Sequence, residues 1–425
     1  MKRTLLIITI LANVLLNQAQ VVTTFAGSGA FGSTDATGIA ASFHFPTGVC
    51  TDAAGNVYVA DRENDKIRKI SSAGVVSTLA GSGVSGSTDA TGIAASFYYP
   101  YSVCIDTSGN IYVADANNNK IRKINPAGVV STFAGSGAIG STDATGSAAS
   151  FYSPRGICTD VIGNVYVADV GNHKIRKINS VGVVSTFAGS GIAGSTDATG
   201  IAASFAFPIG VCADATGNVY VADYNNHKIR KISPTGVVST FAGSGVIGST
   251  DTTGIAASFN YPTGVCIDST GNVYVADYNN HKIRKISPTG EVSTFAGTGA
   301  SGSTDAAGIS ASFSSPFGVC SDAAGNIYVG DAGNNKIRKI LAFSADIQSL
   351  SANTINFNAY PNPTSTTLTV QTNEILESIN IYNSLYSLIQ TENKTTFSVE
   401  QLPAGIYWIQ IKTAKGNRRA RFVKE

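Results

Sequence analysis

Six cysteines are the residues of this sequence with the most obvious chemistry, and they recur at one fixed interval. They are Cys50, Cys104, Cys158, Cys212, Cys266 and Cys320. An even number of cysteines in an exported protein can indicate disulfides. Here each cysteine occupies the same place in a repeated unit, whereas a disulfide needs Cα atoms within about 7 Å of each other. Equivalent residues of neighbouring units should lie farther apart, so we predict six buried free thiols that act as small apolar side chains.

Basic residues gather in the phrase KIRKI, which occurs six times and supplies 18 of the 29 lysines and arginines. A basic cluster can indicate a nucleic-acid interface. Each unit also carries three aspartates, at positions equivalent to Asp52, Asp61 and Asp89, so the units are nearly neutral. We therefore interpret the basic side chains as long stems that cover apolar sheet edges and pair with carboxylates in turns, and we expect no nucleic-acid partner.

Histidines and carboxylates do not converge on a metal site. Three of the four histidines share one turn position with other residue types, the full set being Asp65, Asn119, His173, His227, His281 and Asn335. Because the histidines share this position with aspartate and asparagine, we expect them to be exposed turn residues. They are expected to form no zinc site, since zinc needs about three or four converging ligands. One aspartate in each GSTDATG-like loop is few for calcium, which takes about six to eight oxygens. The sequence predicts no metal and no cofactor, with calcium in these loops left open.

Short strands in a 54-residue repeat must position all these residues. In the second copy, residues 102–106 and 110–115 are rich in β-branched and aromatic residues and flank a turn at Gly109. Residues 120–124 and 129–135 follow, each after a turn rich in asparagine, proline or glycine. Each unit therefore predicts four antiparallel strands, and four-stranded units with a period of about 50 residues are typical of β-propeller blades.

The consensus PxGVCxDxxGNVYVADxxNxKIRKI resembles the NHL repeat, and six copies lie in phase between residues 21 and 340. The resemblance implies a six-bladed β-propeller. The sequence departs from the usual repeat in its cysteine and in a long connection, GSGxxGSTDATGIAASF. Because this connection recurs with nearly the same residues, we expect it to be ordered. Phe43 and its equivalents should fill grooves between blades, the Ala-Ala-Ser before each should form one helical turn, and the aspartate should cap a local turn.

The phrase VVTTFAG at residues 21–27 matches the fourth strand of a unit, but the first three strands do not precede it. The last unit shows the reverse, because no fourth strand follows its third, residues 336–340. We predict that residues 21–27 pair with residues 336–340, so that the two ends of the repeat region share one blade. This pairing closes the ring and removes an open sheet edge at which other chains could pair.

One place in the unit varies while the strands stay constant. Ahead of the first strand the copies read HFPTG, YYPYS, YSPRG, AFPIG, NYPTG and SSPFG. In a propeller these positions form a ring of loops on one face, and aromatic residues and arginine favour binding there. We predict ligand contacts from His44, Phe45, Thr47, Tyr98, Tyr99, Tyr101, Tyr152, Arg155, Phe207, Ile209, Asn260, Tyr261, Thr263 and Phe317. Neutral drift at tolerant loop positions is the alternative.

The two ends of the chain indicate export. Residues 1–20 combine Lys2 and Arg3 with a short apolar run and NQAQ, the pattern of a cleaved secretory signal that is too short to be a membrane anchor. After a linker at 341–354, residues 355–425 show the alternation of a small antiparallel β-sandwich. The motifs YPNP, LPAGIY and a basic RRARFVK ending resemble the C-terminal sorting domain of the type IX secretion system. The resemblance implies the secretion machinery as a partner and passage through the outer membrane, followed by release or surface attachment.

The sequence thus predicts an exported, monomeric, all-β protein that binds an extracellular protein or glycan, with a six-bladed propeller at 21–340 and a sorting domain at 355–425. No membrane-spanning segment is expected after signal removal. A metal-dependent hydrolase or lyase with a site in the central channel is one alternative. It has little support, because the propeller holds only Glu63 and Glu291 as glutamates and its units are nearly identical. A repetitive surface or matrix component is the other, favoured by the similarity of the units.

Overall fold

The computed structural model describes residues 20–341, 357–372, 375–383, 388–413 and 416–425. The predicted signal segment, except Gln20, and the predicted linker, except Leu341, lie outside the described residues. The chain divides into two compact units, Met1–Phe343 and Ser344–Glu425. Within the described residues no helix is long and apolar enough to span a bilayer.

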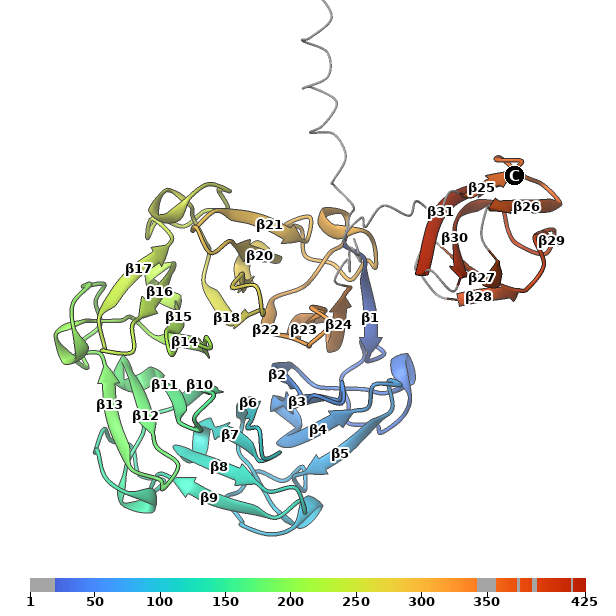
Figure 1. Ribbon diagram of the computed structural model, residues 1–425. Coiled ribbons are helices and arrows are strands. Elements are labelled where there is room, and N and C mark those ends of the chain that lie inside the picture. Colours follow the sequence, from blue (N-terminus) through green and yellow to red (C-terminus); the bar gives the residue numbers. More distant parts are fainter. Residues whose placement is uncertain (1–19, 342–356, 373–374, 384–387, 414–415) are drawn as a thin grey trace, which may run out of the picture. The chain divides into compact units, whose positions relative to one another are not determined.

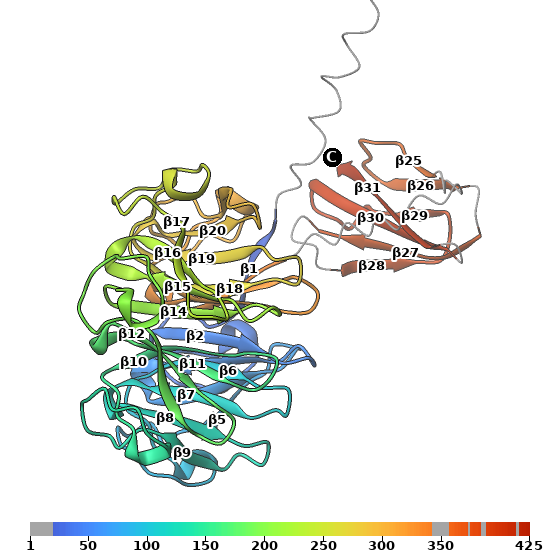
Figure 2. The same ribbon diagram turned by 60° about the vertical axis from the view of Figure 1, so that its left-hand side comes forward.

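The first unit is a ring of six four-stranded antiparallel sheets, or blades, around a central axis (Figures 1 and 2). The predicted all-β propeller is therefore confirmed, and in blades 1 to 5 the first strand lies innermost. The strands are, in blade 1, β2 (Pro46–Thr51), β3 (Val57–Asp61), β4 (Lys66–Ile70) and β5 (Val76–Ala80); in blade 2, β6 (Pro100–Ile105), β7 (Ile111–Asp115), β8 (Lys120–Ile124) and β9 (Val130–Ala134); in blade 3, β10 (Pro154–Thr159), β11 (Val165–Asp169), β12 (Lys174–Ile178) and β13 (Val184–Ala188); in blade 4, β14 (Pro208–Ala213), β15 (Val219–Asp223), β16 (Lys228–Ile232) and β17 (Val238–Ala242); in blade 5, β18 (Pro262–Ile267), β19 (Val273–Asp277), β20 (Lys282–Ile286) and β21 (Val292–Ala296); and in blade 6, β22 (Pro316–Ser321), β23 (Ile327–Asp331), β24 (Lys336–Ile340) and β1 (Val22–Ala26).

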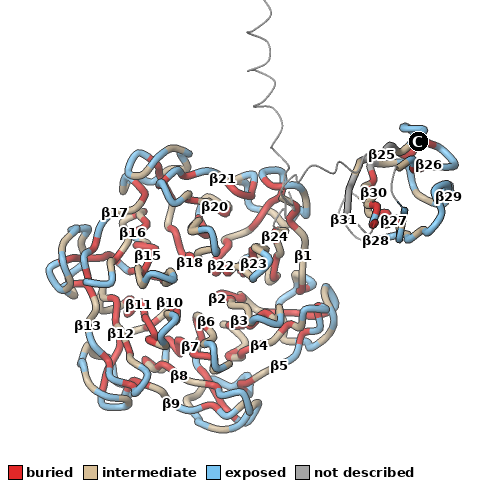
Figure 3. Tube along the Cα trace, viewed as in Figure 1, coloured by how far each residue is buried: buried red, intermediate tan, exposed pale blue. Residues whose placement is uncertain are grey.

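Neighbouring blades pack through the apolar side chains that alternate along their strands. Between blades 1 and 2, for example, Tyr58 and Ile67 pack with Val103 and Ile111 in one buried cluster. Buried residues follow the strands, and exposed residues gather in turns and rim segments (Figure 3). At Gly210 the blades approach so closely that a Cβ atom would lie 2.1 Å from the carbonyl oxygen of Thr263, which excludes any larger residue.

The predicted pairing of the chain's first strand with the last blade is confirmed. Strand β1 pairs antiparallel with β24, with Val22 opposite Ile340 and Thr24 opposite Arg338. Val22 and Ala26 are fully buried. The two ends of the repeat region are thereby joined in one sheet, and the ring closes through backbone hydrogen bonds.

Each long connection between blades is ordered, as predicted, and covers the outer edge of the blade that follows it. In blade 1 the N–H of Val76 donates to the carbonyl of Ala36 at 2.8 Å, and that of Thr78 to Asp35 Oδ2 at 2.9 Å. Both N–H groups lie on the outer side of β5, the outermost strand of the blade. Because the connection occupies them, another chain cannot pair with this edge there. Phe43 and its five equivalents are fully buried, which confirms their predicted role.

Two details of the connections differ from the prediction. The single helical turn begins two residues before the Ala-Ala-Ser and ends on its first residue, as six 3₁₀ helices: η2 (Gly38–Ala40), η4 (Gly92–Ala94), η6 (Gly146–Ala148), η8 (Gly200–Ala202), η10 (Gly254–Ala256) and η12 (Gly308–Ser310). The aspartate does not cap a local turn. Asp35 instead pairs with Arg68, 33 residues away, because the connection folds back over β4 and β5.

The arginine of each KIRKI phrase is fully buried, whereas we predicted basic stems that cover the apolar edges of the sheets. Nη1 of Arg68 donates to Asp61 Oδ2 at 2.7 Å and to the carbonyl of Ser42 at 3.1 Å. Nη2 donates to the carbonyl of Thr34 and to Asp35. The guanidinium also lies 5.2 Å from the ring centre of Phe43. The predicted pairing with carboxylates is confirmed, and it ties three strands and a connection into each blade.

The six thiols follow the prediction closely. All six cysteines are free; five are buried and Cys50 is partly buried. Burial raises the pKa of every one of these thiols. They pack between blades as apolar side chains, Cys320 for example beside Val49 of blade 1.

The second unit consists of two sheets. One has the order β25-β26-β29 and the other β28-β27-β30-β31. Their strands are β25 (Phe357–Tyr360), β26 (Thr367–Thr372), β27 (Leu376–Tyr382), β28 (Leu388–Glu392), β29 (Thr396–Ser398), β30 (Gly405–Thr413) and β31 (Gly416–Lys424). A buried cluster that includes Leu368, Ile379, Ile409 and Phe422 draws side chains from both sheets.

Candidate functional site

The variable positions lie on one face of the propeller, which we call the mouth face. It comprises residues 44–47 and 61–65 of blade 1 and their equivalents in the other blades, because first strands begin and second strands end there. Each second strand leads into a short 3₁₀ helix: η3 (Arg62–Asn64), η5 (Ala116–Asn118), η7 (Val170–Asn172), η9 (Tyr224–Asn226), η11 (Tyr278–Asn280) and η13 (Ala332–Asn334).

Near the axis, large side chains from several blades pack together on this face. Tyr101, Ile209 and Phe317 form one buried cluster with Ala116 and Ala332. The rings of Tyr101 and Phe317 meet edge to face, with their centres 5.2 Å apart. The mouth of the ring therefore carries an aromatic and aliphatic floor.

A second ring of residues is held by hydrogen bonds between blades. Phe45, Tyr99, Ser153, Phe207, Tyr261 and Ser315 all have positive φ, which is uncommon for residues other than glycine. Each backbone N–H donates to a side chain of the preceding blade, as Tyr99 does to Asp65 Oδ1 at 2.7 Å and Ser153 to Asn119 Oδ1 at 2.9 Å. The side chains at that turn position thus fix the backbone of the predicted binding loops.

The histidines at this turn position are acceptors in the same hydrogen bonds, which corrects the prediction that they are exposed turn residues. Nδ1 of His173, His227 and His281 accepts from the N–H of Phe207, Tyr261 and Ser315, at 3.1, 3.1 and 3.0 Å. His227 is only 7% exposed. Burial lowers the pKa of all three imidazoles, which favours the neutral ring that can accept at Nδ1. Asp, Asn and His can each occupy this position because each side chain supplies an acceptor for the same backbone hydrogen bond.

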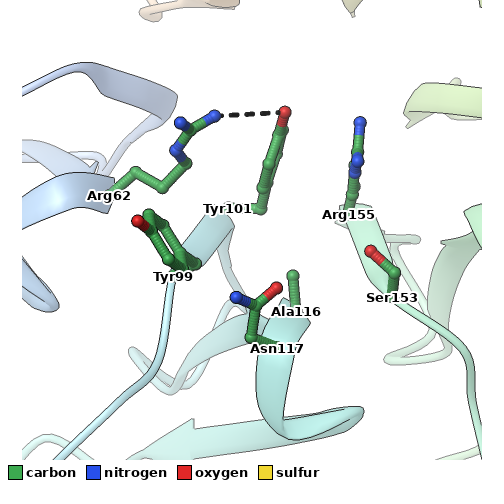
Figure 4. A pocket seen from close by; sticks show the side chains of 7 residues that line it. All are labelled: Arg62, Tyr99, Tyr101, Ala116, Asn117, Ser153 and Arg155. Carbon is green, nitrogen blue, oxygen red and sulfur yellow. Dashed lines mark hydrogen bonds between the residues drawn. The ribbon is translucent and has the colours of Figure 1, made fainter. Parts of the chain in front are cut away.

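Two arginines flank Tyr101 at the edge of the floor (Figure 4). The guanidinium carbon of Arg155 lies 4.6 Å from the centre of the Tyr101 ring, and that of Arg62 lies 5.3 Å from it. Nη1 of Arg62 also donates to the Tyr101 hydroxyl at 3.4 Å. The three side chains border a cleft of about 210 Å³, which is further lined by Tyr99, Ala116, Asn117 and Ser153.

Arg62 differs from Arg155 in having a carboxylate partner. Its guanidinium pairs with Glu63 and packs on the ring of Phe45, 4.5 Å from the ring centre. Partial burial acts to lower the pKa of Arg62, but Tyr101 and Glu63 raise it overall. Among the described residues, Glu63 forms an ion pair with Arg62 alone, and, against the effect of burial, Arg62 holds the pKa of the Glu63 carboxyl below its usual range.

A second cleft of about 290 Å³ adjoins the first. Its lining is Tyr152, Ser153, Arg155, Val170, Gly171, His173 and Phe207, so Ser153 and Arg155 border both clefts. Tyr152 and Phe207 are 42% and 41% exposed, which leaves aromatic surface open to solvent. The two clefts together span blades 1 to 4, and we call them the mouth groove.

The structure brings some of the predicted site residues together and separates others. Phe45, Tyr99, Tyr101, Tyr152, Arg155 and Phe207 border or adjoin the mouth groove. Asn260 and Tyr261 lie farther round the ring in blade 5, while His44 and Tyr98 are outer neighbours that contact Phe31 and Tyr99. Ile209 and Phe317 form part of the floor.

Thr47 and Thr263 are fully buried, so they offer no surface to a ligand. Their hydroxyls donate across blade boundaries, to the carbonyls of Tyr101 at 2.7 Å and Phe317 at 2.9 Å. They hold the floor residues of the next blade in place.

The sequence interpretation overlooked Arg62, Tyr224 and Tyr278, which reach the same face from the 3₁₀ helices. The residue after each VAD or VGD phrase differs among the copies, and this variation could have identified the position as part of the mouth face.

Among the described residues, no group of three or more His, Cys, Asp or Glu side chains is placed to hold a metal ion. Another cleft, of about 300 Å³, lies on the opposite face between blades 5 and 6, lined by Asp268, Lys285, Ala324 and neighbouring residues. Most of its lining comes from turn and strand positions that recur in every blade, and Gln20 adds to it.

Two family models match the chain. One described as NHL repeat matches residues 43–70, 97–124, 151–178, 205–232 and 259–286. One described as Secretion system C-terminal sorting domain matches residues 358–425. Human NHL repeat-containing protein 2 is 34% identical over 283 residues, which is 57% of this chain and 39% of that protein. The chain spans 27% to 43% of the length of four curated relatives.

Solved structures share the propeller fold. A structural genomics protein of unknown function from Bacteroides thetaiotaomicron matches with a TM-score of 0.60 and 21% identity, over 76% of each chain. An auxiliary nutrient binding protein from the same organism matches with a TM-score of 0.57 and 18% identity, also over 76% of each chain. The chain is thus a β-propeller with NHL repeats and a C-terminal type IX secretion sorting domain, which marks it for export to the cell surface or for secretion.

Proposed function

We propose that this protein is an exported binding module whose propeller captures an extracellular ligand in the mouth groove. One observation carries the proposal: the frame of six blades is nearly uniform, whereas the residues that differ between blades meet in adjoining clefts on one face. A uniform frame with local variety is the usual arrangement of repeat proteins that bind through one surface.

The composition of the groove supports binding. Arginine and tyrosine are enriched among residues that dominate binding energy, and both lie here side by side around Tyr101. The floor of Tyr101, Ile209 and Phe317 is packed before any ligand arrives, so little side-chain ordering opposes association. The predicted signal at 1–20 and the sorting domain would deliver this surface to the outside of the cell.

A glycan array, paired with a panel of extracellular proteins, tests the proposal. We expect the full chain to bind a subset of ligands, and the variant Tyr101→Ala/Arg155→Ala to lose that binding. The matched control is Lys285→Ala, which alters the cleft on the opposite face. Ligand binding that survives the double variant but fails in the control would refute the mouth groove as the site. A complete lack of ligands would favour a structural role in a surface or matrix layer.

A further inference from the structure

Arg155 is the least satisfied arginine of the described propeller. Within the described residues its guanidinium has no hydrogen-bond or ion-pair partner. Like the Nε atom of Arg155, those of Arg62 and Arg68 are buried without a partner among the described residues, but the terminal nitrogens of those two arginines are paired. The arginine at the KIRKI position offers a direct contrast, because Arg68 places its terminal nitrogens on two carboxylates and two carbonyls. The Arg155 guanidinium lies over the face of Tyr101, and a stacked contact of this kind does not use its N–H donors.

Charge in the mouth groove is unbalanced as a result. Arg62 is matched by Glu63, but nothing in the described groove matches Arg155. A guanidinium supplies parallel N–H donors that fit a carboxylate, sulfate or phosphate in a bidentate manner. Such a bond is strong where the donor is partly shielded from water, as it is against Tyr101.

The surroundings of Arg155 favour a saccharide over a peptide. The outer strand edges are covered by the connections, as at Val76 and Thr78, so an extended peptide finds no edge strand to join. The groove instead offers the half-exposed aromatic rings of Tyr152 and Phe207 in its second cleft. Neutral hydroxyl and amide groups lie nearby, on Ser153 in both clefts and on Asn117 in the first. Rings of this kind provide apolar faces for sugar rings, while the polar groups can bond their hydroxyls.

We propose that the mouth groove binds an acidic saccharide, with Arg155 pairing with its carboxylate or sulfate group and the half-exposed rings of Tyr152 and Phe207 supporting the sugar. This inference rests on the proposed function and specifies its ligand class. The shared chemistry is an anionic group on a sugar ring, and the test separates uronates from sulfated sugars.

Titration calorimetry on the full chain would use trigalacturonate, its methyl ester, dextran sulfate and dextran. We expect one acidic probe to bind about tenfold or more tighter than its neutral counterpart, because only the acidic probe can form charge-assisted hydrogen bonds with the Arg155 guanidinium. Arg155→Gln should remove this preference, whereas Lys285→Gln, which deletes a charge on the opposite face, should keep it. Arg155→Lys should retain part of it, since lysine keeps the charge but not the planar donor pair.

The inference is overturned if neither acidic probe binds below about 1 mM, or if acidic and neutral probes bind alike and Arg155→Gln has no effect. Tighter binding of polyglutamate than of both acidic saccharides overturns it in favour of a protein partner. These failures differ from failure of the proposed function. Binding of a neutral saccharide that Tyr101→Ala abolishes would leave the groove as a binding site with another ligand class.

Discussion

The Nδ1 atom of His173 accepts a hydrogen bond from the backbone N–H of Phe207, 3.1 Å away across the boundary between blades 3 and 4. The same contact joins His227 to Tyr261 and His281 to Ser315. In the remaining blades an aspartate or asparagine oxygen takes the place of Nδ1, as Asn335 Oδ1 does for Phe45. One acceptor position therefore sets the backbone of the mouth face in all six blades.

These histidines predict a loss of stability in mild acid. Their pKa is lowered by burial, so the unfolded chain binds more protons than the folded one once the pH falls below the ordinary histidine value of 6.5. Stability from this source is complete above that pH and declines as the pH falls towards the folded pKa. The melting temperature should drop between about pH 7 and pH 5, as measured by circular dichroism.

The matched variant replaces all three histidines by asparagine, the residue that the chain itself uses at 119 and 335. His173→Asn/His227→Asn/His281→Asn should flatten the decline over that pH range and leave the melting temperature at pH 8 little changed. If the melting temperature of the variant falls as steeply with pH as that of the unchanged protein, the three histidines are not the source of the acid sensitivity.

Strand β1 should be required for the stability of the whole propeller. Deleting residues 21–27 removes the buried Val22 and Ala26 and exposes β24 as an open edge. The melting temperature should fall by about 10 °C or more, since several kcal/mol are lost from a closed ring. Deleting residues 355–425 should leave the propeller's transition in place, because that segment belongs to a separate compact unit. A deletion of 21–27 that melts like the full chain would contradict the closure.

Arg68 should matter more for stability than its exposed partner. Arg68→Met leaves Asp61 fully buried without its ion partner, which should lower the free energy of unfolding by about 3–5 kcal/mol. Asp35→Asn should lower it by about 1 kcal/mol, because the Asp35 side chain is 46% exposed and asparagine keeps an acceptor for Thr78. Urea denaturation measures both. Equal effects would argue against the buried pair as the main anchor.

The thiols should be present but unreactive. Without reductant, a thiol reagent should titrate none of the six at a useful rate in the folded chain, because burial raises their pKa. In denaturant all six should react. Fewer than six after denaturation would mean that disulfides form, and rapid reaction in the folded chain would mean that the spaces between blades are open.

The repeat made the blades and the closing strand predictable. The strand segments recur at the same interval in every unit, so few alternative strand pairings are possible. Residues 21–27 lack a third strand and residues 336–340 lack a fourth, which indicates that the two segments pair with each other. Contacts across long stretches of sequence were not predictable in this way. Asp35 reaches Arg68 only because the connection folds back along its own blade, and no local pattern specifies that path.

The position of the candidate site was predictable in part. Variation ahead of the first strand correctly indicated the mouth face, but not which of its residues are accessible. Thr47 and Arg155 occupy the same position of the unit, yet one is fully buried by its bond to the next blade and the other faces the groove. Arg62 was missed because it lies beyond the second strand, and only the ring geometry brings it to Tyr101.

A crystal structure of the full chain with the strongest ligand from the array tests the central claim most directly. The account predicts ligand density in the mouth groove, against the Tyr152 ring and within hydrogen-bond distance of Arg155. Density confined to the opposite face, in the cleft beside Lys285, would contradict it.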